Sequence, residues 1–200
     1  LEVRVTALDL AGKLADLSNA ELLVEAARKG CAPVRLAALR AYLDLADAEA
    51  REDAEVAAGM LEKALALAGD EGEGTAQQRA LLALAATGSA RAASKIEAAL
   101  RDPARKALGR EAQVRYASAI GAAGRKEEAI EMLTSILSGD APRSTISSAV
   151  VALEALGADP TIFQKKQGFV AAWKIVGPFP NEGNSAWTTA YFPETRVELD

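Results

Sequence analysis

The sequence of 200 residues contains no histidine and one cysteine, Cys31. The missing histidine excludes Ser-His-Asp and Cys-His catalysis within the chain, because both mechanisms use an imidazole as the base. One cysteine and no histidine leave no ligand set for structural zinc, and a single cysteine cannot form an internal disulfide. We interpret Cys31 as a small residue at a helix start. We expect no catalytic residues, no bound metal and no cofactor.

Long apolar runs are also missing, and none approaches the length that a bilayer-spanning helix needs. The formal net charge of −5 comes from 23 basic and 28 acidic side chains and argues against a general nucleic-acid binder. The chain has no initiator Met and no signal peptide, and it begins at Leu1 within an expected helix. We therefore expect a fragment or processed product of a longer protein, and either a cytoplasmic or an exported location is compatible with this sequence.

Aromatic residues are scarce in the first four-fifths of the chain, since seven of the nine lie beyond residue 162. Alanine dominates the apolar residues of the earlier part, and alanine is both the best helix former and small enough for helices to approach closely. This composition predicts a helical domain over residues 1–160. After Gln167 alanine becomes rarer, and three of the seven prolines fall between residues 178 and 193, so residues 161–200 are predicted to differ in structure.

Apolar residues recur at helical spacing along the first domain, and Gly, Pro, Ser or Thr stand at the ends of most of these segments. Pro33 suits the first turn of a helix, where its missing N–H would be unpaired in any case. Ser89 and Thr75 are predicted N-caps. The spacing predicts helices over residues 3–17, 19–30, 33–46, 48–68, 75–88, 90–100, 110–123, 127–137 and 142–157.

A short pattern of Val or Gln, Arg and small apolar residues occurs four times, with its arginines at Arg4, Arg35, Arg79 and Arg115. These arginines are 31, 44 and 36 residues apart, and a fifth copy near Ile146 lacks the arginine. A period of this length with two helices per unit is typical of stacked helical hairpins. The predicted fold is mainly α, a right-handed α-solenoid of four to five helical hairpins, followed by a short C-terminal β or extended segment.

The helix that begins Pro33-Val34-Arg35-Leu36-Ala37-Ala38-Leu39 resembles the HEAT-repeat family, in which a Val-Arg-x-x-Ala-x-x-Ala-Leu helix recurs. The resemblance covers residues 1–157 and implies a curved frame that holds other molecules. Two stretches depart from it, because the helix over 48–68 is overlong and residues 122–130 look more like the start of a tetratricopeptide helix. An irregular helical bundle is the alternative architecture.

The charged residues along the helical domain could either stabilise the fold or bind another molecule. We expect the four repeated arginines to bind neighbouring carboxylates or helix C-terminal carbonyls, which would set the register of stacking. A ligand-binding role for Arg35, Arg79 and Arg115 is the alternative. The acidic residues between Asp44 and Glu55 are interpreted as a solvated face. The basic run over 101–115 is interpreted as solvated charge or as a patch for an acidic partner.

The C-terminal string Trp173-Lys174-Ile175-Val176-Gly177-Pro178-Phe179 is more distinctive than the repeats. It resembles the opening of a galactose-binding-like β-sandwich found beside helical repeats in multidomain bacterial proteins. Two or three strands cannot form an independent sheet, so residues 161–200 would be either the start of a truncated β domain or a cap on the helical array. Trp173, Trp187 and Tyr191 are candidate carbohydrate-stacking residues, or else the core of a small unit.

The sequence thus favours a non-catalytic scaffold that binds a protein partner, or other domains of the same parent chain, on a face lined by one helix of each pair. The alternative function is an accessory helical region of a multidomain enzyme or carbohydrate-binding protein whose active residues lie outside this chain. A protein partner is expected, with no nucleic acid and no membrane span, and carbohydrate is the weaker alternative ligand.

Overall fold

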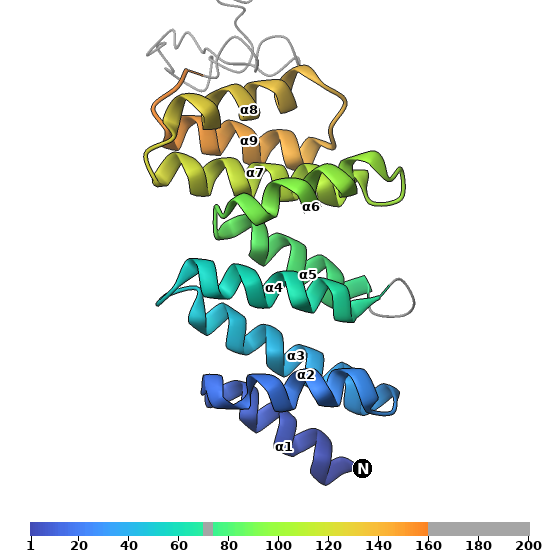
Figure 1. Cartoon of the computed structure of the whole chain (residues 1–200). Helices are drawn as coiled ribbons and strands as arrows, with labels where there is room; N and C mark the ends of the chain where they lie inside the picture. The colour runs from blue at the N-terminus through green and yellow to red at the C-terminus, as the bar shows by residue number, and fades with distance from the viewer. Residues whose placement is uncertain (70–73, 160–200) are drawn as a thin grey trace, which may run out of the picture. The chain divides into compact units, whose positions relative to one another are not determined.

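The computed structural model describes residues 1–69 and 74–159. The chain divides into two units, Leu1–Pro160 and Thr161–Asp200, and all of the described residues belong to the first unit. Within these residues the regular elements are helices, so the mainly α prediction is confirmed for the described part of the chain (Figure 1). The predicted β segment lies outside the described residues. The helices are α1 (Glu2–Lys13), α2 (Ala20–Lys29), α3 (Ala32–Glu49), α4 (Ala54–Ala68), α5 (Gly74–Ala86), α6 (Ala90–Arg101), α7 (Lys106–Ala122), α8 (Lys126–Ser138) and α9 (Arg143–Ala155), with a short 3-10 helix, η1 (Leu17–Asn19), between α1 and α2.

Helix ends follow local chemistry where the sequence carries a clear signal. The Ser89 hydroxyl accepts a hydrogen bond from the Arg91 backbone N–H and caps α6, as predicted. Pro33 lies in the first turn of α3, and Cys31 is the exposed residue that precedes this helix. Gly88 and Gly124 have φ angles of 67° and 95° just beyond α5 and α7, a conformation that costs glycine least.

Two predicted boundaries near the start of the chain are wrong. We expected one helix over 48–68, but α3 continues to Glu49 and α4 begins only at Ala54. The Asp53 side chain accepts hydrogen bonds from the backbone N–H groups of Glu55 and Val56, and this cap starts a new helix. Similarly, α1 ends at Lys13 rather than near Leu17, because Asp16 accepts from the Ser18 N–H and starts η1.

Helix α7 also starts earlier than predicted. We expected it to begin near Arg110, whereas α7 begins at Lys106. The break at Asp102-Pro103 is present, and the Asp102 carboxylate accepts a hydrogen bond from the Ala104 backbone N–H. Only the four residues 102–105 therefore separate α6 from α7, and the chain re-enters a helix sooner than the spacing of apolar residues indicated.

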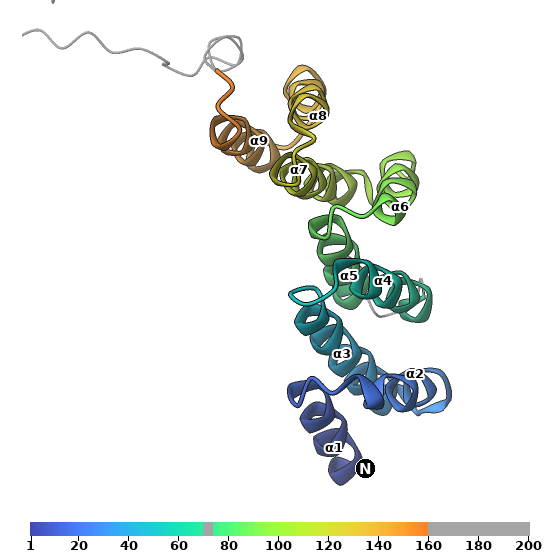
Figure 2. The ribbon, with the colours of Figure 1, turned by 60° about the vertical axis from the view of Figure 1, so that its left-hand side comes forward.

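The helices pack in two layers within this unit. The odd-numbered helices contact one another in chain order, from α1 to α3, α5, α7 and α9, while α2, α4 and α6 contact one another in the same way. Helices α4, α6 and α8 each also pack on the odd-numbered helices that precede and follow them, and α2 packs on α3. Figure 2 shows the even-numbered helices on one side of the odd-numbered ones. Every extensive contact among the described helices therefore joins helices that are one or two positions apart in the chain.

The core between the layers is made of leucine, isoleucine and many alanines, which are fully or nearly fully buried. Small residues at the crossings bring backbones together. At Gly12 of α1, a Cβ atom would lie 2.7 Å from the Ala41 Cα of α3, so glycine is required for this close approach. The largest fully buried side chains are Leu23, Leu39, Leu43, Leu45, Leu61, Leu81, Leu84, Ile120, Leu133, Ile136 and Leu153.

None of the helices in the described ranges combines the length and the apolar character that crossing a bilayer requires.

Candidate functional site

A groove runs over the odd-numbered helices α3, α5, α7 and α9, and we call it the odd-helix groove. It consists of two open hollows of about 470 and 690 Å³, and Ala86 and Arg115 line both. The first hollow lies over α3, α5 and α7, and the second over α5, α7 and α9. The lining residues are Asp47, Thr75, Gln78, Arg79, Leu82, Ala83, Ala86, Val114, Arg115, Ser118, Ala119, Ser147, Ser148, Val151, Ala152 and Ala155.

The spacing of the lining residues shows how α5 and α9 each present one side to the groove. The α5 residues recur at intervals of three and four from Thr75 to Ala86, and the α9 residues do so from Ser147 to Ala155. Such residues share one side of a helix. Alanine and serine make up four of the five lining residues of α9, so another molecule can approach the backbone of this helix closely.

Arg79 lies in the groove and links α5 to α3. Its Nη2 atom donates to Asp44 at 2.6 Å and to Asp47 at 2.5 Å, across 35 and 32 positions of sequence. Partial burial disfavours the charged guanidinium, but the hydrogen bonds to Asp47 and Asp44 outweigh it, so the pKa of Arg79 is raised. The predicted arginine–carboxylate contact is confirmed for Arg79. The interpretation of Asp44 and Asp47 as simply solvated is wrong, because both bind this cation.

Arg115 lies where the two hollows meet and has a different environment. Its Nη2 atom is 3.2 Å from Glu111, one turn earlier in the same helix. The predicted contact with a carboxylate is therefore present, but it does not cross to another helix. The Arg115 side chain is half exposed. A guanidinium has five N–H donors, so Arg115 retains donors that can point into the groove.

Two groove serines use their hydroxyl protons within their own helices. Ser118 donates to the Val114 carbonyl and Ser148 donates to the Ser144 carbonyl, each at 3.0 Å. A hydroxyl that donates in this way keeps lone pairs that can accept a hydrogen bond. The second hollow thus offers acceptors at Ser118 and Ser148 beside the exposed apolar side chain of Val151.

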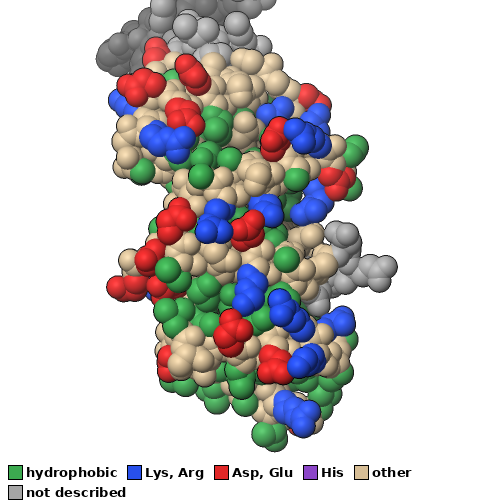
Figure 3. All heavy atoms as spheres, viewed as in Figure 1, with side chains coloured by type: hydrophobic (Ala, Val, Ile, Leu, Met, Phe, Trp, Pro, Cys, Tyr) green, Lys and Arg blue, Asp and Glu red, His purple; other side chains and the backbone are tan. Residues whose placement is uncertain are grey.

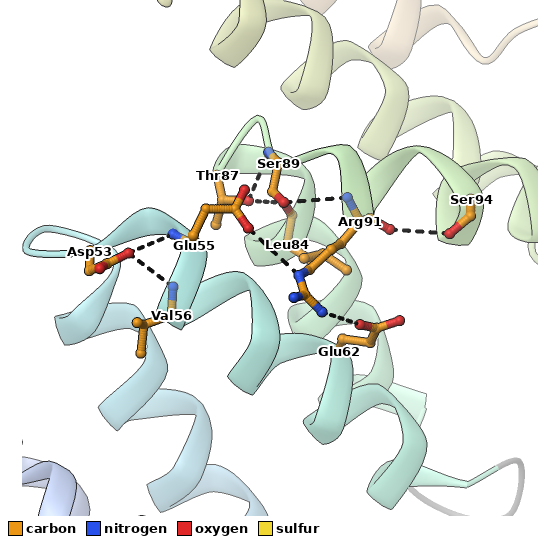
Figure 4. Close-up of polar contacts among 9 residues, drawn as sticks. All are labelled: Asp53, Glu55, Val56, Glu62, Leu84, Thr87, Ser89, Arg91 and Ser94. Atoms are coloured by element: carbon orange, nitrogen blue, oxygen red, sulfur yellow. Dashed lines mark hydrogen bonds and ion pairs between the residues drawn. The ribbon is translucent and has the colours of Figure 1, made fainter.

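A second set of charged side chains lies on the even-numbered helices, and Figure 4 shows its centre. Arg91 reaches from the start of α6 to α4, where it is 3.6 Å from Glu55 and 3.1 Å from Glu62. Lys95 is 3.0 Å from Glu62 as well. The hydrogen bonds from Lys95 and Arg91 lower the pKa of Glu62. These contacts join α6 to α4, as Lys63 and Glu21 join α4 to α2 at 3.0 Å.

The structure brings together only part of the predicted binding set. Arg79 and Arg115 both line the first hollow. Arg35 is exposed near the start of α3, twelve positions before Asp47 and so about 18 Å from it along the helix axis. The candidate stacking residues Trp173, Trp187 and Tyr191 lie outside the described residues. Arg35, Arg79 and Arg115 therefore do not line one continuous binding surface.

Other groove residues were not singled out from the sequence. These are Ser118, Ser147 and Ser148, together with Val151, whose side chain is 62 % exposed. The spacing of Ser147, Ser148 and Val151 shows that they share one side of α9, but it does not show that this side is left uncovered.

In the described ranges no group of three or more Cys, Asp or Glu side chains is arranged to hold a metal ion. Comparison with family models, with curated proteins and with solved structures finds no match to this chain.

Proposed function

We propose that the helical unit is a HEAT-like, right-handed α-solenoid of four to five hairpins. The hairpins would be α1–α2, α3–α4, α5–α6 and α7–α8, with α9 as the first helix of a fifth. The contacts between the helices support this proposal, since α3 packs on α4, α5 on α6 and α7 on α8, while α1 and α2 both pack on α3. A stack whose units contact only their neighbours is typical of helical repeats.

The function of this unit would be to hold an extended segment of a partner protein in the odd-helix groove, without catalysis. The single observation that carries this proposal is the continuity of the groove across four successive odd-numbered helices. A continuous groove of this kind suits a chain segment rather than a compact small molecule. Its small side chains would let the segment lie close to α7 and α9.

The groove also indicates which chemistry the segment should have. Arg115 can donate to a carbonyl or a carboxylate, while the Ser118 and Ser148 hydroxyls can accept from backbone N–H groups. Val151 is positioned for contact with an apolar side chain. Arg79 would contribute less to binding, because Asp44 and Asp47 already occupy it. We therefore expect a peptide with one apolar residue beside a polar or acidic one.

The test is selection of short peptides from a displayed random library on the full chain, followed by calorimetric measurement of affinity for the peptides recovered. Val151→Glu places a charge in the second hollow and should weaken binding at least about tenfold. Arg115→Gln should weaken peptides that carry a carboxylate by about three- to tenfold.

Val56→Glu provides the matched control. Val56 is an exposed valine on α4, outside the groove, with 45 % of its surface accessible. This variant should bind the peptides as the unmodified chain does. If Val56→Glu and Val151→Glu weaken binding equally, or if neither does, the odd-helix groove is not the binding site.

A further inference from the structure

Exposed apolar side chains are concentrated at the N-terminal end of the helical unit. Of the eight large hydrophobic side chains that are exposed among the described residues, six lie within the first 22 positions. Figure 3 shows hydrophobic side chains gathered at this end of the molecule. They are Leu1, Val3, Leu10, Leu14, Leu17 and Leu22. Concentrated apolar surface of this kind marks an interaction site more often than isolated exposed residues do.

Three of these side chains form a stripe along α1 and its C-cap residue, Leu14. Val3, Leu10 and Leu14 are separated by seven and four positions, so they lie on the same side of the helix. Gly12 is nine positions after Val3, on the opposite side, where it packs against Ala41 of α3. The stripe is therefore the side of α1 that points away from α3. Its residues are 82 %, 55 % and 74 % exposed.

The stripe is complementary to a second copy of itself in the antiparallel direction. If a two-fold axis passes between Ala7 and Leu8, Val3 of one copy lies between Leu10 and Leu14 of the other. This arrangement places a side chain in the space between residues i and i+4 of the facing helix, as in packed helix pairs. Ala7 lies near the axis, where its small side chain permits a close approach.

The charges that flank the stripe match in the same register. Glu2 is in the first turn of α1 and Lys13 is in the last. The eleven positions between them place both on the same side of the stripe. In an antiparallel pair with this axis, each Glu2 faces Lys13 of the other copy, so two ion pairs form. The antiparallel helix dipoles are favourable as well.

We propose that two copies of this chain associate through α1, as an antiparallel two-fold pair that buries Val3, Leu10 and Leu14. This surface is separate from the odd-helix groove, whose residues begin at Asp47. Two-fold association uses the same patch on both subunits, which the positions of Glu2 and Lys13 satisfy. The dimer would leave both grooves available to partner segments.

Sedimentation velocity of the full chain, with any tag at the C-terminal end, tests this over an approximately hundredfold range of concentration. We expect a reversible monomer–dimer equilibrium. Leu10→Glu buries a charge in each half of the interface and should raise the dimer dissociation constant at least about tenfold. Val56→Glu is the control, because Val56 has similar exposure on α4. Circular dichroism and thermal unfolding verify that each variant is folded.

Charge exchange tests the direction of the pair. Glu2→Lys alone and Lys13→Glu alone should each weaken the dimer about two- to tenfold, since each brings like charges together twice. The double variant should restore the original dissociation constant. A monomer throughout the concentration range overturns the proposal, as does equal weakening by Leu10→Glu and Val56→Glu. Failure of the double variant to recover overturns the antiparallel pairing.

Discussion

Helices α2 to α6 and helices α7 to α9 are held to their neighbours by different interactions. In the first region, charged side chains cross between helices two positions apart, as Arg79 does to Asp44 and Lys63 does to Glu21. In each of these pairs the cation lies on the later helix and the carboxylate on the earlier one. The second region depends instead on close approach at glycines. A Cβ at Gly121 of α7 would lie 3.1 Å from the Ala129 Cβ of α8, and one at Gly109 of α7 would lie 2.9 Å from the backbone nitrogen of Leu100 in α6.

This difference has consequences for stability. Partly exposed ion pairs contribute little each, are weakened by salt and depend on pH. Close contacts at a glycine are insensitive to salt and to pH, but they leave no room for an added atom. Ion pairs within the second region that the structure shows, such as Arg115 with Glu111 and Arg125 with Glu128, are local to one helix. Substitutions and solvent conditions should therefore affect the two regions differently.

The largest expected effect comes from adding one methyl group in the second region. Gly109→Ala brings a Cβ against the α6 backbone, which cannot move aside, so we expect a loss of about 1–3 kcal/mol in the free energy of unfolding. Gly59→Ala is the control, because no atom lies within 4 Å of its added Cβ, and it should stabilise α4 by about 0.5–1 kcal/mol. Urea unfolding measures both. Equal stability of the two variants would contradict the close-approach account.

A smaller effect is expected from breaking the charged link between α3 and α5. Arg79→Met keeps the apolar stem but leaves Asp44 and Asp47 without their shared cation, and the loss should be about 1 kcal/mol because the side chains are about two-fifths exposed. Arg101→Met removes an exposed pair with Glu97 inside one helix and should cost about 0.3 kcal/mol. A double-mutant cycle with Asp47→Asn measures the coupling. If the stability losses of Arg79→Met and Asp47→Asn add up in the double variant, the two side chains are not coupled.

Acid should weaken the first region through Glu62. Its folded-state pKa lies below its ordinary value of 4.5 because of Lys95 and Arg91, so its stabilising contribution is complete above that value. The contribution declines as pH falls, since the unfolded chain takes up the proton first. Urea midpoints measured from about pH 5 to about pH 3 should therefore fall less steeply for Glu62→Gln than for the unmodified chain. An unchanged slope would show that Glu62 is not coupled to these cations.

The smallest effect should come from salt, and hydrogen exchange can resolve it by region. Raising the salt concentration screens the pairs between α4 and α6, so amide protection there should fall by about 0.5 kcal/mol relative to α7 and α8. The comparison within one sample removes effects of salt that act on the whole chain. A uniform change in protection along all helices would mean that the two regions do not differ in the way described.

Local signals in the sequence predicted much of the helical structure. Ser89, Pro33, Gly88 and Gly124 act at helix ends through interactions that span a few residues, and such interactions are readable from short stretches. The boundary between α3 and α4 was missed for a related reason. Asp53 was grouped with its acidic neighbours as solvated charge, although its side chain caps α4.

The candidate site was predictable to a lesser extent. Arg79 and Arg115 were identified from their repeated motif, and both line the groove. The repeat suggested that Arg35 would belong with them, but it lies too far from Asp47 along α3. The contributions of Ser118, Ser148 and Val151 depend on which side of each helix is left uncovered, and spacing alone does not identify that side.

The sequence by itself determined that the described chain is helical, where most of its helices begin and end, and which chemistries its composition excludes. These properties follow from single residues and from contacts between near neighbours. The tertiary structure alone decided that Arg79 meets Asp44 and Asp47, that Gly109 touches the α6 backbone, and that Val151 faces outward. Such contacts depend on the register between helices, which is set by the packing of many small side chains at once.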